Sequence, residues 1–427
     1  MTATSTDSLT VRSATHGLSV VQGTALSVGA VLGTGVITLP AVAAGIAGPA
    51  SLVAWLIMVV LSIPLASTFA ALGARYPDSG GVSTYARRAF GGRAATVVGW
   101  VFYFAVPVGA PAAAMMAGNY VADAVGGGRA TAIAVGYALI AIVVIMNAFG
   151  LRISGRAQLA LTGGLALIMT ITIVAAVPHA HWSSLTPFAP HGWSAIGPAA
   201  AVLVWGFAGW EAVASLSAEY RHSQRDVPRA AAAAITIVGV LYLGLATTAL
   251  LVLGPATGRS TAPLSDVLAI GIGGQVRIVT ALVAVLLTIG AMNAYFAGGS
   301  KLGAALGRDG GLPSWISHGS AVGEIPRRSL LITGALATAS QTVAMIFRLD
   351  LTDLVLFTTG AFTLVYIFGT AAAVRLLPPR SLGWWTALVA LLSVLALAAL
   401  TGLHLIWAVA IALGAYLSTR LRRGAAR

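Results

Sequence analysis

One carboxylate, Glu211, lies well inside a long apolar segment of the chain. Ionisable groups are costly within a membrane, and burial disfavours the charged form of a carboxyl group. Such a group could take up and release protons near neutral pH and couple proton movement to a conformational change. Alternatively, it is a hydrogen-bonded carboxyl that only fixes the second half of its segment. Both roles require a chain that encloses Glu211 among apolar helices.

Two glycine-rich interruptions occupy matching places in the apolar pattern. The first segment breaks at Leu32-Gly33-Thr34-Gly35 and is expected to resume at Val36, and the sixth breaks at Gly206-Phe207-Ala208-Gly209-Trp210, directly before Glu211. Backbone that leaves a helix inside a membrane must be buried in protein or line a cavity. Matching interruptions in two halves of a chain indicate the binding site of a transporter. The alternative is close packing of small residues between helices.

Composition places the chain in a membrane. Only 8% of the 427 residues are charged and 58% are hydrophobic, whereas a soluble domain has about a quarter of its residues charged. The net charge of +13 does not indicate a nucleic-acid partner, because the basic residues lie at the ends of apolar segments and not along one face. We therefore expect membrane lipid around the chain and no nucleic acid.

Twelve apolar segments are long enough to cross a bilayer. Their expected bounds are 18–45, 50–74, 94–122, 130–149, 157–177, 195–218, 230–254, 276–300, 328–347, 353–374, 382–401 and 403–419. With the N-terminus inside, 20 of the 24 Lys and Arg residues are cytoplasmic, and the exceptions are Arg129, Arg259, Arg277 and Arg348. This positive-inside bias predicts that both termini are cytoplasmic.

The topology implies an inverted repeat. Because each block of five spans is odd in number, the first block begins inside and the second outside, and the interrupted segments 1 and 6 open the two blocks. The expected fold is an all-α integral membrane protein with twelve transmembrane helices in a five-plus-five inverted repeat. The expected parts are a cytoplasmic tail, a single transmembrane domain and a basic tail, at 1–17, 18–419 (repeats about 18–177 and 195–374, extra spans 382–419) and 420–427.

Five short motifs, in order along nearly the whole chain, resemble the amino acid–polyamine–organocation (APC) superfamily. They are Gly33 to Ile37 with Pro40, Arg75 to Gly91, Trp205 to Glu211, Glu219 to Arg229, and Gly290 to Pro313. The resemblance implies the LeuT-like fold of that superfamily, in which helices 1 and 6 are interrupted. It also implies transport of amino acids by alternating access.

The third span narrows the resemblance and other positions depart from it. Val106 to Ala112 looks like the bacterial methionine and branched-chain amino-acid exporters. Lys301, the only lysine, stands where family members usually carry Arg. Some members place a lysine in the fifth span at the position of a sodium ion, but the corresponding residue here is Gly164. This departure argues against coupling through such a lysine.

A zwitterionic amino acid presents two charges that must be held. A half-helix that starts after Thr34 would offer unpaired N–H groups and a positive dipole end to the carboxylate. Gly33 and Gly35 would allow close approach, and the Thr34 hydroxyl could donate a hydrogen bond. The ammonium group needs acceptors, which the carbonyls of the second interruption can supply, near Trp205, Phe207 and Ala208.

The remaining candidate residues concern selectivity. Val106, Pro107 and the aromatic rings of Trp205 and Phe207 predict an apolar pocket for an uncharged aliphatic or thioether side chain. The two aromatic rings could cover the ligand as a lid or pack as ordinary core residues. Asn293 in the eighth span could reach the ligand or bond between helices, as polar residues in spans often do.

The sequence therefore predicts a secondary transporter of neutral amino acids, with proton-coupled efflux of methionine and branched-chain amino acids as the favoured mode. An importer or exchanger of the same superfamily is the alternative, and a channel or a membrane-embedded enzyme is a remote one. Catalytic motifs are missing from the sequence, so no enzymatic activity is expected. No metal or cofactor is expected beyond a proton gradient. The resemblance implies a bacterial cell membrane, and nothing in the sequence indicates an oligomeric state.

Overall fold

The computed structural model describes residues 18–76, 81–151, 155–210, 220, 222–320 and 324–424. Regular structure in these ranges is helical, apart from one isolated bridge between Leu18 and Tyr220. The all-α prediction is confirmed. Glu211 lies outside the described residues, as do Glu219 and the two terminal tails predicted at 1–17 and, in part, 420–427.

The first apolar segment forms two helices, α1 (Val20–Val31) and α2 (Leu39–Ala47). The helix resumes at Leu39, three residues later than the expected Val36. Pro40 explains the start, because proline lacks an N–H group and suits the first turn of a helix. The carbonyl of Gly35 accepts the N–H groups of Thr38 and Leu39, at 3.1 and 2.8 Å. The half-helix that was expected directly after Thr34 is therefore a turn at that point.

The other helices follow the expected segments closely. They are α3 (Ser51–Arg75), α4 (Gly81–Phe90), α5 (Gly92–Val125), α6 (Arg129–Ala148), α7 (Gly155–Ala176), α8 (Ile196–Leu203), α10 (Ser223–Leu253), α11 (Pro263–Ile272), α12 (Val276–Arg308), α13 (Arg327–Ile346), α14 (Leu351–Leu376), α15 (Leu382–Thr401) and α16 (Ile406–Gly424). Two of them, α4 and α11, lie in stretches that the sequence analysis left as loops. Both are short, so neither could have been recognised as a span.

Nine helical stretches among the described residues are long and apolar enough to cross a membrane. Two of these, Leu39–Arg75 and Leu382–Arg420, each run through two consecutive helices, and α1, α11 and Trp193–Phe207 are shorter apolar helices. These helices agree with the expected multi-pass membrane protein. The count of twelve spans and the inverted repeat stay predictions.

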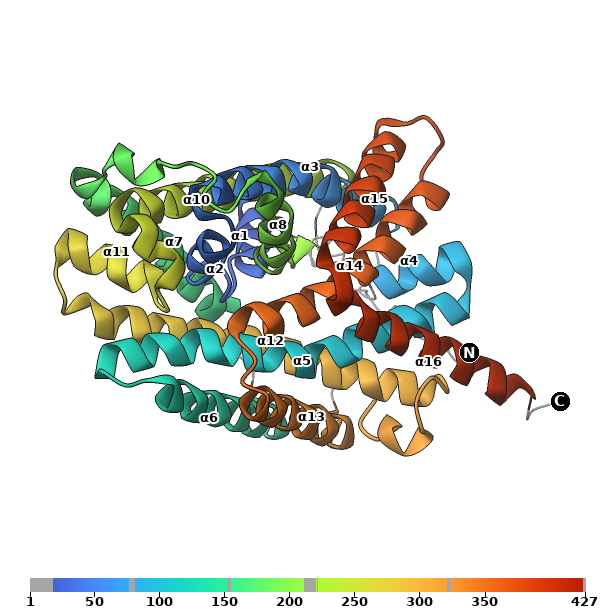
Figure 1. Cartoon of the computed structure of the whole chain (residues 1–427). Coiled ribbons are helices and arrows are strands. Elements are labelled where there is room, and N and C mark those ends of the chain that lie inside the picture. Colours follow the sequence, from blue (N-terminus) through green and yellow to red (C-terminus); the bar gives the residue numbers. More distant parts are fainter. Residues whose placement is uncertain are drawn as a thin grey trace, which may run out of the picture.

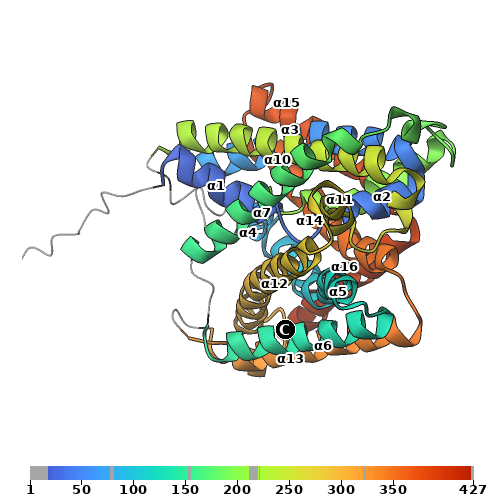
Figure 2. The ribbon, with the colours of Figure 1, turned by 90° about the vertical axis from the view of Figure 1, so that its left-hand side faces the viewer.

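The helices form layers around the two interrupted segments. In Figures 1 and 2, α6 and α13 lie together on one side and α3 and α10 on the opposite side, with the long helices α5 and α12 between them. The helices α1, α2 and α8 lie between the layer of α3 and α10 and that of α5 and α12 (Figure 1). Across the view of Figure 1, α11 is at one end of the molecule, and α4 and the C-terminal end of α16 are at the other.

Small side chains allow this dense packing around α5. Its central stretch from Ala105 to Gly118 consists mainly of Ala, Gly and Pro, and most of these residues are buried. A Cβ atom at Gly118 would overlap the backbone of Ala132 in α6, so the two helices are in close contact there. Close approach through small residues is a main source of helix association in membranes.

Candidate functional site

The two interruptions lie against each other. The side chain of Trp205 packs on Gly35, where a Cβ atom would overlap the indole ring. In the other direction, Gly209 has a φ of +122°, and a Cβ atom there would lie 2.6 Å from the carbonyl oxygen of Ala30. Glycine is required at position 209, because other residues rarely adopt that backbone conformation. The prediction that the two interruptions form one site is consistent with this geometry.

One tyrosine joins both interruptions. The hydroxyl group of Tyr242, in α10, lies 2.9 Å from the carbonyl oxygen of Val31 and 2.8 Å from that of Gly206. Its ring packs edge-on against Trp55 and Phe207, with centroid distances of 5.3 and 5.2 Å. The Gly206 carbonyl thus has a partner inside the protein, as a membrane requires. The Val31 carbonyl also accepts the N–H group of Gly33 at 2.7 Å.

A second tyrosine holds the sixth segment. The hydroxyl oxygen of Tyr366, in α14, accepts a hydrogen bond from the N–H group of Gly209 at 3.2 Å. The sequence analysis missed both Tyr242 and Tyr366. Each tyrosine carries a hydroxyl group within a long apolar segment, and this can be seen in the sequence. The sequence does not show which group the hydroxyl binds.

The interruptions differ in the groups that they leave unpaired. Within the part of the chain that the structure describes, the N–H groups of Thr34, Gly35 and Val36 have no hydrogen-bond acceptor. Under the same restriction, the carbonyls of Phe207 and Ala208 have no donor. The first interruption therefore offers donors and the second offers acceptors.

A cavity of about 990 Å³ lies next to both interruptions. Seven of the nine predicted binding residues line it, namely Gly33, Thr34, Gly35, Val106, Trp205, Ala208 and Asn293. The two others, Phe207 and Pro107, are not among the lining residues. Ligand pockets are about 300–1,000 Å³, so this cavity has room for a small ligand and a route of access.

The structure separates the two aromatic residues that were predicted as a lid. The ring of Phe207 is buried against Trp55 and Tyr242, with only 3% of the residue exposed. This is the core-packing role that the sequence left open. Trp205 lines the cavity, where its ring lies against Gly35 and also approaches Gly109 in α5. Of the two rings, the one that borders the cavity is that of Trp205.

The cavity is closed at one end and open at the other. Near Trp205 the lining is buried, with Thr34 at 3% and Thr358 at 1% exposure. At the opposite end it reaches Leu159, which is 44% exposed, and Lys301, which is also exposed. The open end lies toward α4 and the C-terminal part of α12. The distribution of arginine predicts that this end faces the cytoplasm.

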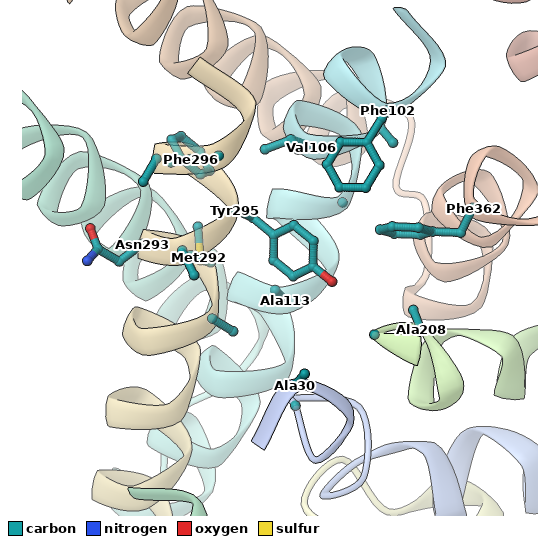
Figure 3. Close-up of a pocket in the computed structure, with 18 of the residues that line it drawn as sticks. Ala30, Phe102, Val106, Ala113, Ala208, Met292, Asn293, Tyr295, Phe296 and Phe362 are labelled. Atoms are coloured by element: carbon teal, nitrogen blue, oxygen red, sulfur yellow. The ribbon is translucent and has the colours of Figure 1, made fainter. Parts of the chain in front are cut away.

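Three aromatic rings form an apolar wall of the cavity. Phe102 of α5, Tyr295 of α12 and Phe362 of α14 contact one another, with centroid distances of 5.9 to 6.4 Å. Figure 3 shows the three rings together, across the cavity from Ala30 and Ala208 of the two interrupted segments. The sequence analysis did not identify this wall, because the three residues are far apart in the chain.

The Asn293 side chain is used between helices. Its Oδ1 accepts a hydrogen bond from Nδ2 of Asn147 in α6 at 2.6 Å, and its Nδ2 donates to the carbonyl of Leu151 at 3.3 Å. Figure 3 shows the amide turned away from Tyr295. Asn293 borders the cavity, but its polar atoms support the bonding role that the sequence left open.

Charged groups are sparse around the cavity. Among the described lining residues, Lys301 is the one charged side chain, and it lies at the open end. The described ranges contain no group of three or more His, Asp or Glu residues that could hold a metal ion. Glu211, the residue predicted to couple proton movement, lies outside these ranges.

The family profile of amino acid permeases matches residues 18–415, and the chain belongs to this family. It is 31% identical over 404 residues to the uncharacterized amino acid permease YecA of Bacillus subtilis, covering 95% of both chains. It is 28% identical to the L-methionine/branched-chain amino acid exporter YjeH of Escherichia coli, covering 85% of this chain and 87% of that one. The vacuolar cationic amino acid transporter 4 of Arabidopsis thaliana is 29% identical, over 75% of this chain and 57% of the relative.

Membership of this family confirms the expected APC resemblance and the class of small-molecule transporters. These relatives are permeases and transporters and not enzymes, which agrees with the expectation from the missing catalytic motifs. The relatives are named for different substrates, so membership of the family establishes amino acid transport but neither the particular amino acid nor the direction.

Proposed function

We propose that the chain is an alternating-access transporter of neutral amino acids with aliphatic or thioether side chains. The observation that carries the proposal is the pairing of free N–H groups on one interruption with free carbonyls on the other, beside a single cavity. A zwitterion needs donors for its carboxylate and acceptors for its ammonium group. The closed and open ends of the cavity suit a carrier that exposes its site to one side at a time.

The carboxylate is assigned to the first interruption, where N–H groups of Thr34, Gly35 and Val36 are free and the Thr34 hydroxyl lies beside them. The ammonium group is assigned to the second, where the carbonyl of Ala208 is free next to the cavity. In the proposed bound state Trp205 covers the ligand from the closed end. The inverted repeat predicted from the sequence places both interruptions at the middle of the membrane.

Selectivity for an uncharged side chain follows from the lining. Val106, Met292 and the wall of Phe102, Tyr295 and Phe362 present apolar surface. A cationic side chain would need a fixed anion to offset its desolvation, and an acidic one a fixed cation. Among the described lining residues neither stands near these rings, since Lys301 lies at the open end. Neutral substrates therefore suit this cavity.

Export of methionine and branched-chain amino acids is the direction and substrate class that we favour. The support is the third-span motif and the 28% identity to an exporter of that name. Import or exchange is the alternative. Proton coupling is assigned to Glu211, which follows directly after the second interruption in the sequence.

The proposal is tested by uptake and exchange in proteoliposomes across neutral, cationic and acidic amino acids, with and without a pH gradient. Saturable counterflow of neutral amino acids is expected, and a flux that does not saturate would indicate a channel instead. A pH gradient should drive net transport in the native protein. Glu211→Gln should remove that dependence while exchange continues. Unchanged transport and pH dependence in Glu211→Gln would exclude the coupling role.

A further inference from the structure

A cluster of charged and polar side chains joins three helices at the closed end of the molecule. Arg277 of α12 contacts Asp123 of α5 through one nitrogen of its guanidinium group and Asp266 of α11 through the other, the latter at 3.2 Å. The second oxygen of Asp123 accepts a hydrogen bond from Ser265 at 2.9 Å, and that of Asp266 accepts one from Ser260 at 2.6 Å. Every carboxylate oxygen of the cluster is thus used.

Tyr120 extends this cluster to the first interruption. It lies one turn before Asp123 on the same face of α5 and is buried. Its hydroxyl oxygen accepts the N–H group of Leu264 at 3.1 Å, and its proton is donated to the carbonyl of Ile37 at 2.5 Å. Three consecutive residues at the start of α11 are therefore held by α5 and α12. The same hydroxyl reaches the interruption that carries Gly33 to Gly35.

The helix ends give the ion pair a specific role. Asp123 is in the last turn of α5 and Arg277 is in the first turn of α12. A helix dipole disfavours an anion at the C-terminal end and a cation at the N-terminal end. Each charge is therefore at an unfavourable end and is compensated by the other. The side chains are only 17% and 36% exposed, so loss of one leaves the other poorly solvated.

We propose that Asp123, Arg277, Asp266 and Tyr120 form a latch that keeps the outer end closed while the inner end of the cavity is open. The inference rests on the proposed function, because alternating access requires the closed end to open in turn. To open it, α2 and the segment around Ile37 must move away from α5, which breaks the hydrogen bond to Tyr120. Release of α11 from Asp123 and Arg277 frees the segment that lies across the ends of these helices.

The absence of cysteine from the chain allows a direct test. A Thr358→Cys reporter lies in the cavity near the closed end, where Thr358 and Trp205 both approach Gly109. The Thr358→Cys protein is compared with the same protein carrying, in addition, Asp123→Asn, Arg277→Gln or Tyr120→Phe. A membrane-impermeant thiol reagent is added from the outside, and the rate of labelling is measured on protein that is monodisperse after extraction.

Each variant should raise the labelling rate from outside by about tenfold. For Asp123→Asn and Arg277→Gln this corresponds to the loss of one hydrogen bond to a charged group, and for Tyr120→Phe to the loss of the two hydrogen bonds with the backbone of Leu264 and Ile37. The charge exchange of Asp123→Arg with Arg277→Asp should return the rate toward the native value. Arg87→Gln removes an ion pair with Asp309 at the opposite end, 3.5 Å long, and should leave the rate unchanged.

Labelling rates that stay at the native value in Tyr120→Phe and in a monodisperse charge variant would overturn the latch. An equal rise in Arg87→Gln would overturn it as well, because the effect would then be general loosening. The labelling readout needs no substrate. The two proposals can fail separately. If the native protein shows no amino acid exchange but the latch variants still raise the labelling rate, the proposed substrate class is refuted and the latch is supported.

Discussion

The two interruptions occupy matching places in the sequence and yet present opposite chemistry. The first, at residues 32–38, is a turn with free N–H groups, and α2 begins only at Leu39. The second carries free carbonyls at Phe207 and Ala208, and two tyrosine hydroxyls bind its other backbone groups. This difference suits a ligand with one negative and one positive end. Matching positions in the predicted repeat thus present different backbone groups.

The interruptions also differ in the space around their glycines. A Cβ atom at Gly33 would meet nothing closer than the Val31 carbonyl oxygen at 3.9 Å, whereas one at Gly35 would overlap Trp205 and one at Gly209 would overlap Ala30 at the end of α1. Glycine therefore serves two purposes here. At Gly35 and Gly209 it allows contact between protein segments, and at Gly33 it leaves room beside the cavity.

Gly209→Ala should have the largest effect. The left-handed backbone costs about 1–3 kcal/mol for a residue other than glycine, and the added methyl group would also overlap the carbonyl of Ala30. We expect loss of transport and a lower melting temperature of the purified protein. Gly163→Ala in α7 is the control, since a Cβ atom there meets nothing within 4 Å and alanine favours helices. Full transport by Gly209→Ala would show that the close contact between the second interruption and the end of α1 is not required for function.

Gly35→Ala should have the next largest effect, because the methyl group displaces Trp205. We expect at least about a tenfold loss of substrate affinity, or 1.4 kcal/mol, together with a lower melting temperature without substrate. Gly33→Ala should weaken binding but leave the substrate-free melting temperature unchanged. Thermal melts with and without substrate separate the two. If both variants melt like the native protein and bind normally, the first interruption does not form the site. Leucine at either position should abolish binding.

Tyr242→Phe should have an intermediate effect. The ring keeps its contacts with Trp55 and Phe207, but the buried carbonyl of Gly206 loses the hydroxyl group, at a cost of about 1–3 kcal/mol for an unsatisfied polar group. The Val31 carbonyl keeps the N–H group of Gly33. Substrate affinity should fall about tenfold, measured as a rise in KM. Tyr103→Phe is the control, because that buried hydroxyl donates to Ser329 away from the interruptions. Equal changes of KM in both variants would mean that Tyr242 acts only on general stability.

The smallest effect is expected for the pair Asn147 and Asn293. Polar contacts between membrane helices contribute about 0.6 kcal/mol on average, so either alanine variant should lower stability slightly and leave affinity unchanged. The loss of stability in the double variant should be about that of a single variant and less than the sum of the two, since both residues share one hydrogen bond. A large rise in KM for Asn293→Ala alone would indicate that its amide contacts the substrate.

The sequence predicted the elements and much of the site because a bilayer restricts the choices. Long apolar segments must be helices, and glycine-rich breaks must be enclosed, so the contact between Gly35 and the Trp205 segment could be anticipated. Contacts between side chains that are far apart in the sequence could not be predicted. Tyr242 and the wall of Phe102, Tyr295 and Phe362 meet only after packing, and no spacing in the sequence reports their neighbours.

The misplaced residues have the same cause. Phe207 was expected at the ligand because it lies in the second interruption, but the turn directs its ring toward Trp55 and Tyr242. The restart of the first helix was placed at Val36, while Pro40 sets it at Leu39. Residue type predicts that an interruption occurs, and local geometry decides which side chains it presents to the cavity.

The central claim is that the carboxylate and the ammonium group of one amino acid are held by the two interruptions. The most direct test measures how three ligands bind to the purified protein. They are L-methionine, its amide, which lacks the carboxylate, and N-acetyl-L-methionine, which lacks the ammonium group. A ligand present at 100 times its Kd stabilises the folded protein by about 2.7 kcal/mol. We predict a rise in melting temperature with L-methionine alone, and a clearly smaller rise in Gly35→Ala, since a tenfold weaker affinity lowers the stabilisation to about 1.4 kcal/mol. An equal rise with the amide or the acetylated form would contradict the account.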